Sequence, residues 1–382
     1  MSYHGRFEEQ KQPKHRKNPQ KTGGKGMKLF LIVLAVVLAL VLVGIGLVYW
    51  FIQNKFSKMN VVTLPEDTYV YTESTEEYTP ETEPEATEET TAATTEETTR
   101  PPMTADDIIN ILVVGQASRA GEEGHMADTT MLVSINTYTE EVTVFSILRD
   151  SLVQLPAYKG LGGGRNKFTM CYALGYQQGG TAGAMEMTNI CLKDNFGIEV
   201  DYNIEVSFDG FIRMIDYLNG VELELTEAEA DYLNKDTLYV QRHIDPGVQV
   251  LQGMEALSYA RMRKAAGDGE SDIKRTARQR NLVSALLKRF QGMSLSELNG
   301  WVDELLPMVT TTMTPSDVTR LAATILPMVS RLSMKGETVP VGKTGWGEMV
   351  DIYGDGTQHS VMQFVSSQQK QLIRAITEAE GN

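Results

Sequence analysis

The sequence predicts a membrane-anchored α/β protein with a mixed, largely antiparallel central sheet flanked by helices (α-β-α). Three observations support this prediction. An uncharged apolar run lies near the N-terminus, a long acidic tract follows it, and strand and helix patterns alternate through the rest of the chain. We therefore expect one transmembrane helix and a disordered stalk to precede a folded body.

The net charge of −15 is distributed unevenly over the 382 residues. Residues 1–28 carry eight Lys or Arg and two Glu, whereas residues 66–99 carry twelve Asp or Glu and no Lys or Arg. The rest of the chain is also acidic, which argues against general nucleic-acid binding because that binding depends on neutralising phosphates. The charge pattern predicts a basic tail over 1–28.

Residues 29–52 form 24 consecutive positions without a charge or a proline. As a helix they would extend roughly 36 Å, enough to cross a bilayer core of about 30 Å. A cleaved signal peptide is the alternative, but the run is too long and no small-x-small cleavage site follows it. The upstream cations predict a cytoplasmic N-terminus, so we expect a single-pass protein of the cell membrane with an extracytoplasmic body.

The composition of residues 53–103 predicts a stalk. Its acidic part holds twelve Thr beside the twelve acids and shows no apolar period, so it has no face to bury. Like charges favour an extended, disordered chain. We expect this spacer to hold the body, residues 104–382, away from the bilayer.

The body opens with patterns typical of a sheet. Residues 108–115 form a short apolar run, and the runs 129–136 and 142–147 are joined by a polar connection that suits a hairpin. Residues 221–225 alternate strictly, which predicts a strand with one wet face. Further strands are expected at 202–208 and 338–341, and helices at 181–196, 208–218, 253–264, 275–290, 295–309, 315–329 and 366–380.

Other sequence features argue against a nucleotide-binding fold, a zinc site and a disulfide. The Gly-rich segments 160–164 and 342–347 lack the spacing of a phosphate loop, and no strand–GxGxxG–helix unit exists, so a doubly wound nucleotide fold is not expected. No two of the five His are spaced as a metal pair, which argues against a zinc enzyme. For Cys171 and Cys191, two buried thiols are favoured over a disulfide.

A cluster of cationic side chains is the unusual feature of the body. Arg261 and Arg263 alternate, so they would diverge on a regular helix and meet one ligand only where that helix ends. Arg275 and Arg278 are three apart and share a helix face, with Gln279 beside them. Several guanidinium groups suit a diphosphate, although a solvated helix face paired with Glu residues is the alternative.

A second group follows the apolar run 142–147, where Arg149 and Asp150 close a predicted strand. Together with the cationic cluster, eight short motifs occur in one order behind the predicted membrane span. They are Asn110–Gly115, Ala127–Leu132, Ser146–Asp150, Lys167, Asn219–Val221, Leu251–Gly253, Tyr259–Lys264 and Asp272–Gln279. In this order, over residues 108–290, the motifs resemble the LytR-CpsA-Psr family of extracytoplasmic cell-wall enzymes.

The resemblance implies a phosphotransferase that moves a glycopolymer, such as teichoic acid or capsule, from a polyprenyl diphosphate carrier to peptidoglycan. It also implies Mg²⁺ or Mn²⁺ as cofactor, polyprenyl diphosphate hydrolysis as an accompanying activity, and a lipid tail in an apolar tunnel between sheet and helices. The helix that carries Phe208, Phe211, Ile212 and Ile215 is the candidate wall, with plain core as the alternative. The expected partners are this lipid-linked polymer, peptidoglycan and the membrane, without nucleic acid.

The same resemblance implies roles for individual residues. Asp128 matches a metal ligand, and Arg149, Asp150 and Arg261 match catalytic positions. For Asp150 three roles are open, in rising order of preference: metal ligand, base, and orienting partner of the neighbouring Arg. The residues that match substrate-binding positions are Arg119, Lys167, Arg263, Arg275, Arg278 and Gln279.

Two positions depart from the family pattern. Ala117 stands where the family usually has Asp, and Met126 stands where an Arg is expected. Loss of a carboxylate removes a hard oxygen ligand, and loss of an Arg removes a phosphate contact. The alternative hypothesis is therefore a catalytically weakened relative that binds polyprenyl-linked lipid as a sensor or regulator of the cell envelope.

Overall fold

The computed structural model describes only part of the chain. The predicted basic tail, the predicted membrane span and most of the predicted stalk lie outside the described residues, among which no helix combines the length and apolarity needed to cross a bilayer. The described residues are 59–65, 107–116, 126–159, 161, 163–263, 272–342 and 345–378.

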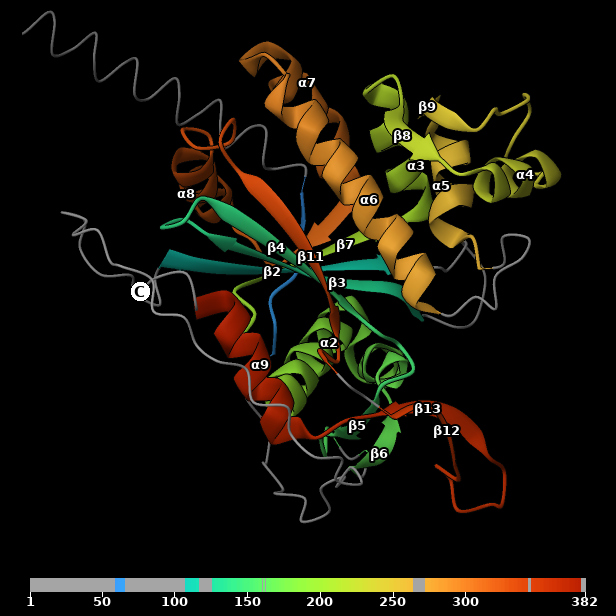
Figure 1. Ribbon diagram of the computed structural model, residues 1–382. Coiled ribbons are helices and arrows are strands. Elements are labelled where there is room, and N and C mark those ends of the chain that lie inside the picture. The colour runs from blue at the N-terminus through green and yellow to red at the C-terminus, as the bar shows by residue number, and fades with distance from the viewer. Residues whose placement is uncertain are drawn as a thin grey trace, which may run out of the picture. The chain divides into compact units, whose positions relative to one another are not determined.

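A seven-stranded mixed sheet forms the centre of the body, in the order β1-β10-β7-β2-β3-β4-β11 (Figure 1). Strands β2, β3 and β4 form an antiparallel meander, β7 joins β2 in parallel, and β11 joins β4 in parallel. The mixed α/β fold predicted from the sequence is therefore confirmed. The strands are β1 (Asn60–Val61), β2 (Ile108–Gln116), β3 (Ala127–Asn136), β4 (Glu141–Ile147), β7 (Tyr202–Ser207), β10 (Val309–Thr311) and β11 (Ser333–Val339).

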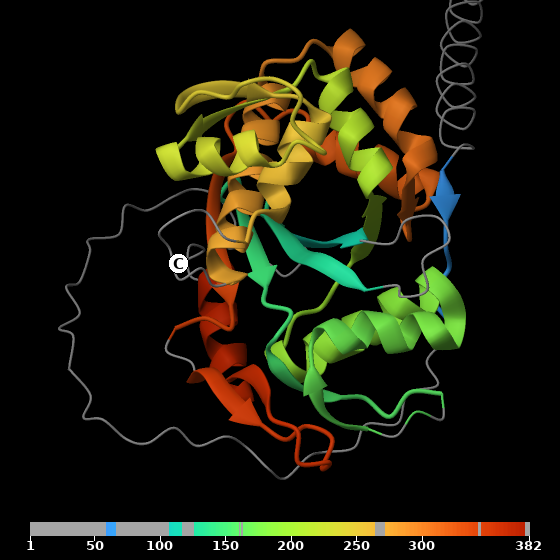
Figure 2. The ribbon, with the colours of Figure 1, turned by 90° about the vertical axis from the view of Figure 1, so that its right-hand side faces the viewer.

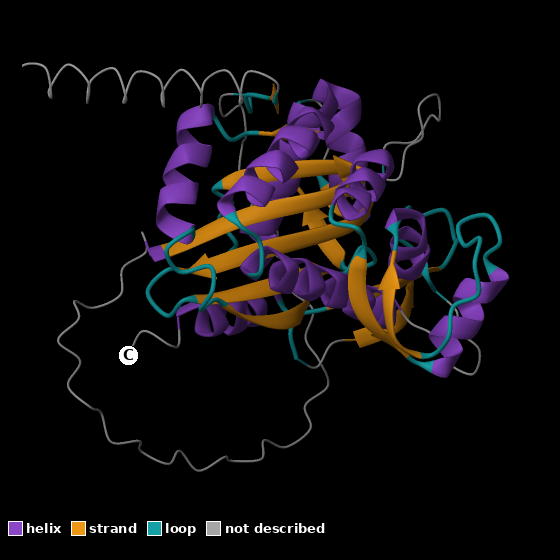
Figure 3. Ribbon diagram, turned by 90° about the horizontal axis from the view of Figure 1, so that it is seen from above, coloured by secondary structure: helices purple, strands orange, loops and turns teal. Residues whose placement is uncertain are grey.

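Helices cover both faces of this sheet. Helices α2 and α9 lie on one face, and α3, α5 and α6 lie on the other (Figures 1 and 3). The strands alternate accordingly, since Leu112 and Val114 belong to the core on the α2 side, whereas Val113 faces the opposite layer. The helices are α2 (Thr169–Phe196), α3 (Phe208–Tyr217), α4 (Glu227–Lys235), α5 (Gly253–Arg261), α6 (Asp272–Gln291), α7 (Leu295–Leu305), α8 (Pro315–Ile325) and α9 (Ser366–Glu378).

Helix α2 begins earlier than predicted and is broken in the middle. Gly179 and Gly180 have non-helical dihedral angles, which glycine adopts readily. The two halves then pack closely, because a Cβ on Gly175 would lie only 2.4 Å from the Gly183 carbonyl oxygen. Cys171 and Cys191, one from each half, are both buried, with their sulfur atoms 2.7 Å apart.

The face opposite α2 carries a smaller unit with its own core. Strand β8 alternates between buried and exposed residues, as its sequence predicted, and pairs with β9. Ile215, Leu233 and Tyr259 are among the buried residues that join α3, α4 and α5 here. The remaining strands are β5 (Leu152–Leu155), β6 (Gly164–Lys167), β8 (Val221–Leu225), β9 (Gly247–Leu251), β12 (Gly345–Val350) and β13 (His359–Gln363).

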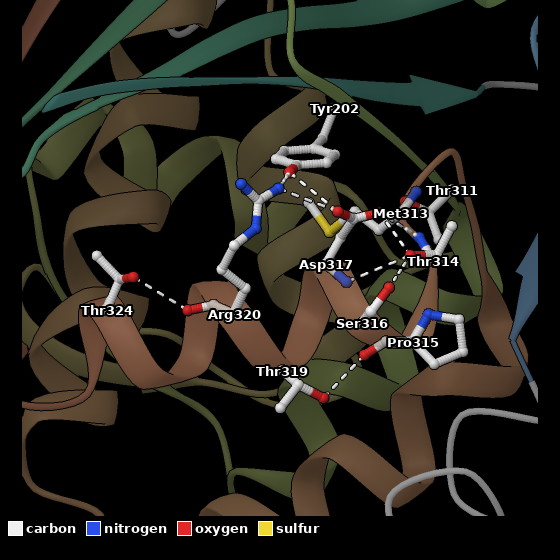
Figure 4. Close-up of polar contacts among 10 residues, drawn as sticks. All are labelled: Tyr202, Thr311, Met313, Thr314, Pro315, Ser316, Asp317, Thr319, Arg320 and Thr324. Carbon is white, nitrogen blue, oxygen red and sulfur yellow. Dashed lines mark hydrogen bonds and ion pairs between the residues drawn. The ribbon is translucent and has the colours of Figure 1, made fainter. Parts of the chain in front are cut away.

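A polar cluster fixes α8 to the sheet. Thr314 and Asp317 form a capping box, in which the Thr314 amide donates to Asp317 Oδ2 at 2.9 Å. The other carboxylate oxygen accepts from the Tyr202 hydroxyl at 3.3 Å and from Arg320 at 3.0 Å (Figure 4). Because Tyr202 begins β7, the start of α8 is tied to a central strand.

Several expected boundaries differ from the structure. Residues 60–61 lie in the predicted stalk but form β1, because their backbone pairs with β10. The helix expected over 295–309 ends at Leu305, since Pro307 follows and β10 begins at Val309. The strand expected at 338–341 begins at Ser333. The segments expected as Gly-rich loops lead into β6 and β12, because both are paired in hairpins.

Candidate functional site

Three chain segments meet at one edge of the sheet. Strands β2 and β4 end there and β3 begins there, because β3 runs antiparallel to both. A bulge marks the start of β3, where Gly115 pairs with Thr129 but Gln116 pairs with Ala127. Asp128 is therefore the extra residue of this bulge, a feature that is common beside active sites.

Asp150 lies between two cationic side chains at this edge. Its Oδ1 is 2.8 Å from Lys167 Nζ, and its Oδ2 is 3.6 Å from Arg149 Nε. The Thr169 amide donates to the Arg149 carbonyl at 3.0 Å, so the start of α2 fixes the turn after β4. All three charged side chains are about a quarter to a third exposed. This geometry agrees with Asp150 as an orienting partner.

Arg261 and Arg263 come together where α5 ends. The helix stops at Arg261 and Met262 leaves the helical conformation, so Arg261 and Arg263 both line the same cavity. Arg261 donates to the Tyr239 hydroxyl at 2.6 Å, and its guanidinium carbon lies 5.1 Å from the Phe208 ring centroid. This cation–π contact holds Arg261 in place without neutralising its charge.

Helix α6 contributes Arg275 and Gln279 to the same cavity, and both are buried. Gln279 Nε2 donates to Thr129 Oγ1 at 2.8 Å and to the Ala260 carbonyl at 3.3 Å. These hydrogen bonds place α6 and the end of α5 over the start of β3. The cationic cluster therefore lies near the start of β3, whereas Arg149, Asp150 and Lys167 are not among the described residues that line the cavity.

Arg278 occupies a different environment from Arg275, although the two were expected on one helix face. Its Nε donates to Glu229 Oε1 at 2.8 Å, and its Nη1 donates to the Met262 carbonyl at 3.1 Å. Arg278 is buried and is not among the described residues that line the cavity. It joins α4, α5 and α6 and has the geometry of a structural residue.

An apolar cavity of about 870 Å³ separates the sheet from the helices above it. Figure 2 shows the central strands between the layer of α3, α5 and α6 and the opposite helix α2. Val113, Met131 and Ile204 form part of its floor, and Phe208 and Phe211 belong to its walls as expected. Ile215, which was expected beside them, is buried in the core of the smaller unit. A cavity of this size and character suits an apolar chain with a charged end.

Arg280 is a half-buried cation whose structural role sequence reasoning missed. Its Nη1 donates to Ser146 Oγ at 2.9 Å and to Thr338 Oγ1 at 3.1 Å, and Gly336 leaves room for its side chain. Burial lowers the pKa of its guanidinium group below the ordinary value. Arg280 ties α6 to β4 and β11. No local signal distinguishes it from Arg278, because its partners are distant in sequence.

The expected metal site is not made by the described residues. No cluster of three His, Cys, Asp or Glu suited to a metal ion occurs among them. Both oxygens of Asp150 face cations, which does not suit a magnesium ligand. Arg119, Ala117 and the side chain of Asp128 lie outside the described set, and Met126 is exposed just before β3.

Comparison with known proteins identifies the family. The sequence model of the LytR_cpsA_psr family matches residues 67–373, which is more than half of the chain. This chain belongs to the LytR_cpsA_psr family. The resemblance seen in the motifs is thereby confirmed for the body of the protein.

Two curated relatives of this LytR_cpsA_psr family member are named polyisoprenyl-teichoic acid–peptidoglycan teichoic acid transferases. TagU from Oceanobacillus iheyensis is 30% identical over 190 residues, which are 49% of this chain and 53% of the relative. TagT from Bacillus subtilis is 30% identical over 196 residues, which are 49% of this chain and 54% of the relative. The chain thus spans about half the length of these relatives.

Solved structures share the fold. Protein gbs0355 from Streptococcus agalactiae has a TM-score of 0.56 at 21% identity, covering 72% of this chain and 88% of that one. TagT bound to LIIa-WTA has a TM-score of 0.53 at 23% identity, covering 72% and 91%. At this level of identity the likeness shows the architecture alone.

Proposed function

We propose that this LytR_cpsA_psr family member is a phosphotransferase that moves a glycopolymer from a polyprenyl diphosphate carrier to peptidoglycan. The observation that carries the proposal is the apolar cavity with Arg261, Arg263 and Arg275 in its lining. Such a site can hold a long apolar chain and a diphosphate at once. The transferase names of TagU and TagT support the same reaction class.

The geometry suggests how the chain's own residues act. The guanidinium groups of Arg261, Arg263 and Arg275 bind the diphosphate and neutralise charge as it develops. A hydroxyl of the acceptor sugar attacks the phosphorus that carries the glycopolymer. The bond from that phosphorus to the bridging oxygen breaks, polyprenyl phosphate leaves, and the hydroxyl proton is released. Arg149 and Lys167, held by Asp150, stabilise the leaving phosphate from the sheet edge.

Magnesium or manganese remains a prediction. The described residues do not form its site, so no step above depends on the metal. Asp128 is the expected ligand, and its place in the β3 bulge beside Thr129 supports a role at this edge. Polyprenyl diphosphate hydrolysis, with water in place of the sugar hydroxyl, is likewise proposed as an accompanying activity.

The proposed location is the cell membrane, with residues 29–52 as a single span and the body outside the cytoplasm. The uncharged run and the upstream cations support this orientation. Protease added to intact cells should digest the body but leave the tail 1–28 protected. Protection of the body in intact cells, with digestion only after lysis, would contradict the proposed orientation.

The full chain in phospholipid vesicles tests the function. We expect release of polyprenyl phosphate from a polyprenyl diphosphate saccharide when a peptidoglycan acceptor is supplied. Arg261→Ala and Arg275→Ala should each lower the rate at least about ten-fold, because each removes a charge-assisted phosphate contact. Arg213→Ala is the control, since Arg213 is exposed on α3 and is not among the described cavity residues.

The second candidate function is a lipid-binding relative with weakened chemistry. Ala117 and Met126 favour it, because both replace groups that would contact metal or phosphate. Biofilm regulatory protein A from Streptococcus mutans, 26% identical over 185 residues, is a relative named for regulation. Tight binding of the lipid donor without release, in the presence of acceptor and metal, would favour this function over transfer.

A further inference from the structure

The sulfur atoms of Cys171 and Cys191 meet in the core between the sheet and α2. Both side chains are fully buried, and they come from the two halves of α2, on either side of the break at Gly179 and Gly180. They are not joined in this structure. Their sulfur atoms are nevertheless 2.7 Å apart, which is only about 0.7 Å longer than a disulfide bond. The chain has just these two cysteines, so each is the other's one possible partner within the chain.

The close packing of the two halves of α2 sets this approach. Cys171 lies four residues before Gly175, so both are on one face of the first half. A Cβ on Gly183 would lie only 2.5 Å from the Gly175 carbonyl oxygen, so the two backbones nearly touch there. Cys191 follows Gly183 by eight residues, a spacing that returns to the same helix face. A bond between the sulfur atoms therefore needs only a small movement of the side chains.

Each half of α2 is also fixed to a different neighbouring segment. At its start, the Thr169 amide donates to the Arg149 carbonyl at 3.0 Å. Near its end, Asn195 Nδ2 donates to the Gln154 carbonyl of β5 at 2.9 Å. A bond between the halves would connect the turn that carries Arg149 to β5 through the core.

We propose that Cys171 and Cys191 form a disulfide as the body folds outside the cytoplasm and that this bond cross-links the two halves of α2. The bond depends on the proposed location of the body but not on the proposed reaction. Two thiols lose two protons and two electrons as the sulfur atoms join, and a disulfide oxidant such as oxidised glutathione is reduced to two thiols. A cross-link between residues 20 positions apart stabilises the fold by restricting the unfolded chain.

Refolding of the full chain in detergent micelles tests whether the bond forms. The experiment starts from the reduced chain in urea, because in the folded state both thiols are buried and burial raises the pKa of Cys191 above its ordinary value. The chain is refolded with oxidised and reduced glutathione, and remaining thiols are blocked with N-ethylmaleimide in urea. Cleavage after Lys167 and Lys193 then gives one peptide, residues 168–193, that holds both cysteines.

We expect this peptide to carry no label and to be lighter than the dithiol by two hydrogen atoms. Labelled or glutathione-bound cysteines would overturn the proposed bond. The same peptide from intact cells, blocked during lysis, should also be oxidised, and its labelling in a body that added protease reaches would overturn the bond as well. Loss of transfer activity in a chain whose peptide is oxidised would contradict the proposed function alone.

A chain that carries both Cys171→Ala and Cys191→Ala is the matched control for stability. We expect the oxidised unaltered chain to unfold at a urea concentration about 1 M higher than the same chain in dithiothreitol. The control should unfold at the same urea concentration with and without dithiothreitol, since it has no thiol to oxidise. Equal midpoints for the oxidised and reduced unaltered chain would overturn the role of the bond as a cross-link of α2.

Discussion

Lys167 is the residue whose contact is simplest to test. It lies 2.8 Å from Asp150 and adds a positive charge beside Arg149. We expect Lys167→Ala to lower the transfer rate about ten-fold, because it removes that charge and one partner that orients Asp150. Arg165→Ala is the matched control on the same strand, since the exposed side chain of Arg165 donates to Gln363 rather than to Asp150. Similar rates for the two variants would contradict the proposed role.

Arg278 should matter for stability more than for binding. Its loss leaves Glu229 buried without its cationic partner, so we expect Arg278→Ala to lower the free energy of unfolding by about 3 kcal/mol. Urea unfolding followed by tryptophan fluorescence measures this change. Exposed Arg263→Ala should alter stability by less than about 0.5 kcal/mol. An unchanged unfolding midpoint for Arg278→Ala would show that Glu229 finds another partner.

The positions of the site arginines could be predicted from the sequence only in part. The convergence of Arg261 and Arg263 follows from a local rule, since two alternating residues can meet only where a helix ends. The different environments of Arg275 and Arg278 do not follow from such a rule. They depend on where α4 and α5 pack, and Glu229 lies 49 residues upstream of Arg278.

The two halves of α2 pack closely against each other at Gly175 and Gly183. Gly175→Ala should destabilise the body by about 1–3 kcal/mol, because the new methyl group would overlap the backbone of Gly183. Thermal unfolding followed by circular dichroism measures this. Gly164→Ala is the control, since a Cβ there has open space. Equal midpoints would mean that the two halves separate without cost.

The capping box of α8 predicts a dependence on pH. Hydrogen bonds from the Thr314 side chain and backbone, followed by Arg320 and Tyr202, hold the pKa of Asp317 below its ordinary value. Its stabilising effect is therefore present above the unfolded pKa of about 3.9 and is lost as pH falls through the folded pKa. Asp317→Asn should lower Tm by about 2 °C at pH 7. This difference should shrink below about pH 4, and a difference that persists unchanged at pH 2 would contradict this account.

Local patterns predicted some elements and missed others for physical reasons. Strand β8 was predictable because its alternation depends on one buried face. The first half of α2 was missed because Gly175, Gly179 and Gly180 weaken a helical pattern that packing restores. Strands β1 and β10 are too short to show a period, and each exists because a neighbouring strand supplies hydrogen bonds.

For the whole molecule, stability depends on whether the folded body includes β1. A soluble protein that begins at residue 104 lacks β1 and leaves Thr310 and Thr311 at an unpaired edge. We expect it to unfold at lower urea concentration and to aggregate more readily than one that begins at Lys55, where the compact unit starts. Equal stability of the two proteins would show that β1 does not contribute to the fold.

The position of β11 has a consequence for how the protein is made. This strand comes late in the chain, yet it pairs along the whole length of β4, which is among the first strands of the body. During synthesis from the N-terminus, the outer edge of β4 stays without its partner until nearly the entire body has appeared. Val144 and Phe145, which are fully buried in the complete sheet, lie on β4. Until β11 has been synthesised, this edge of β4 is therefore open to pairing with other chains.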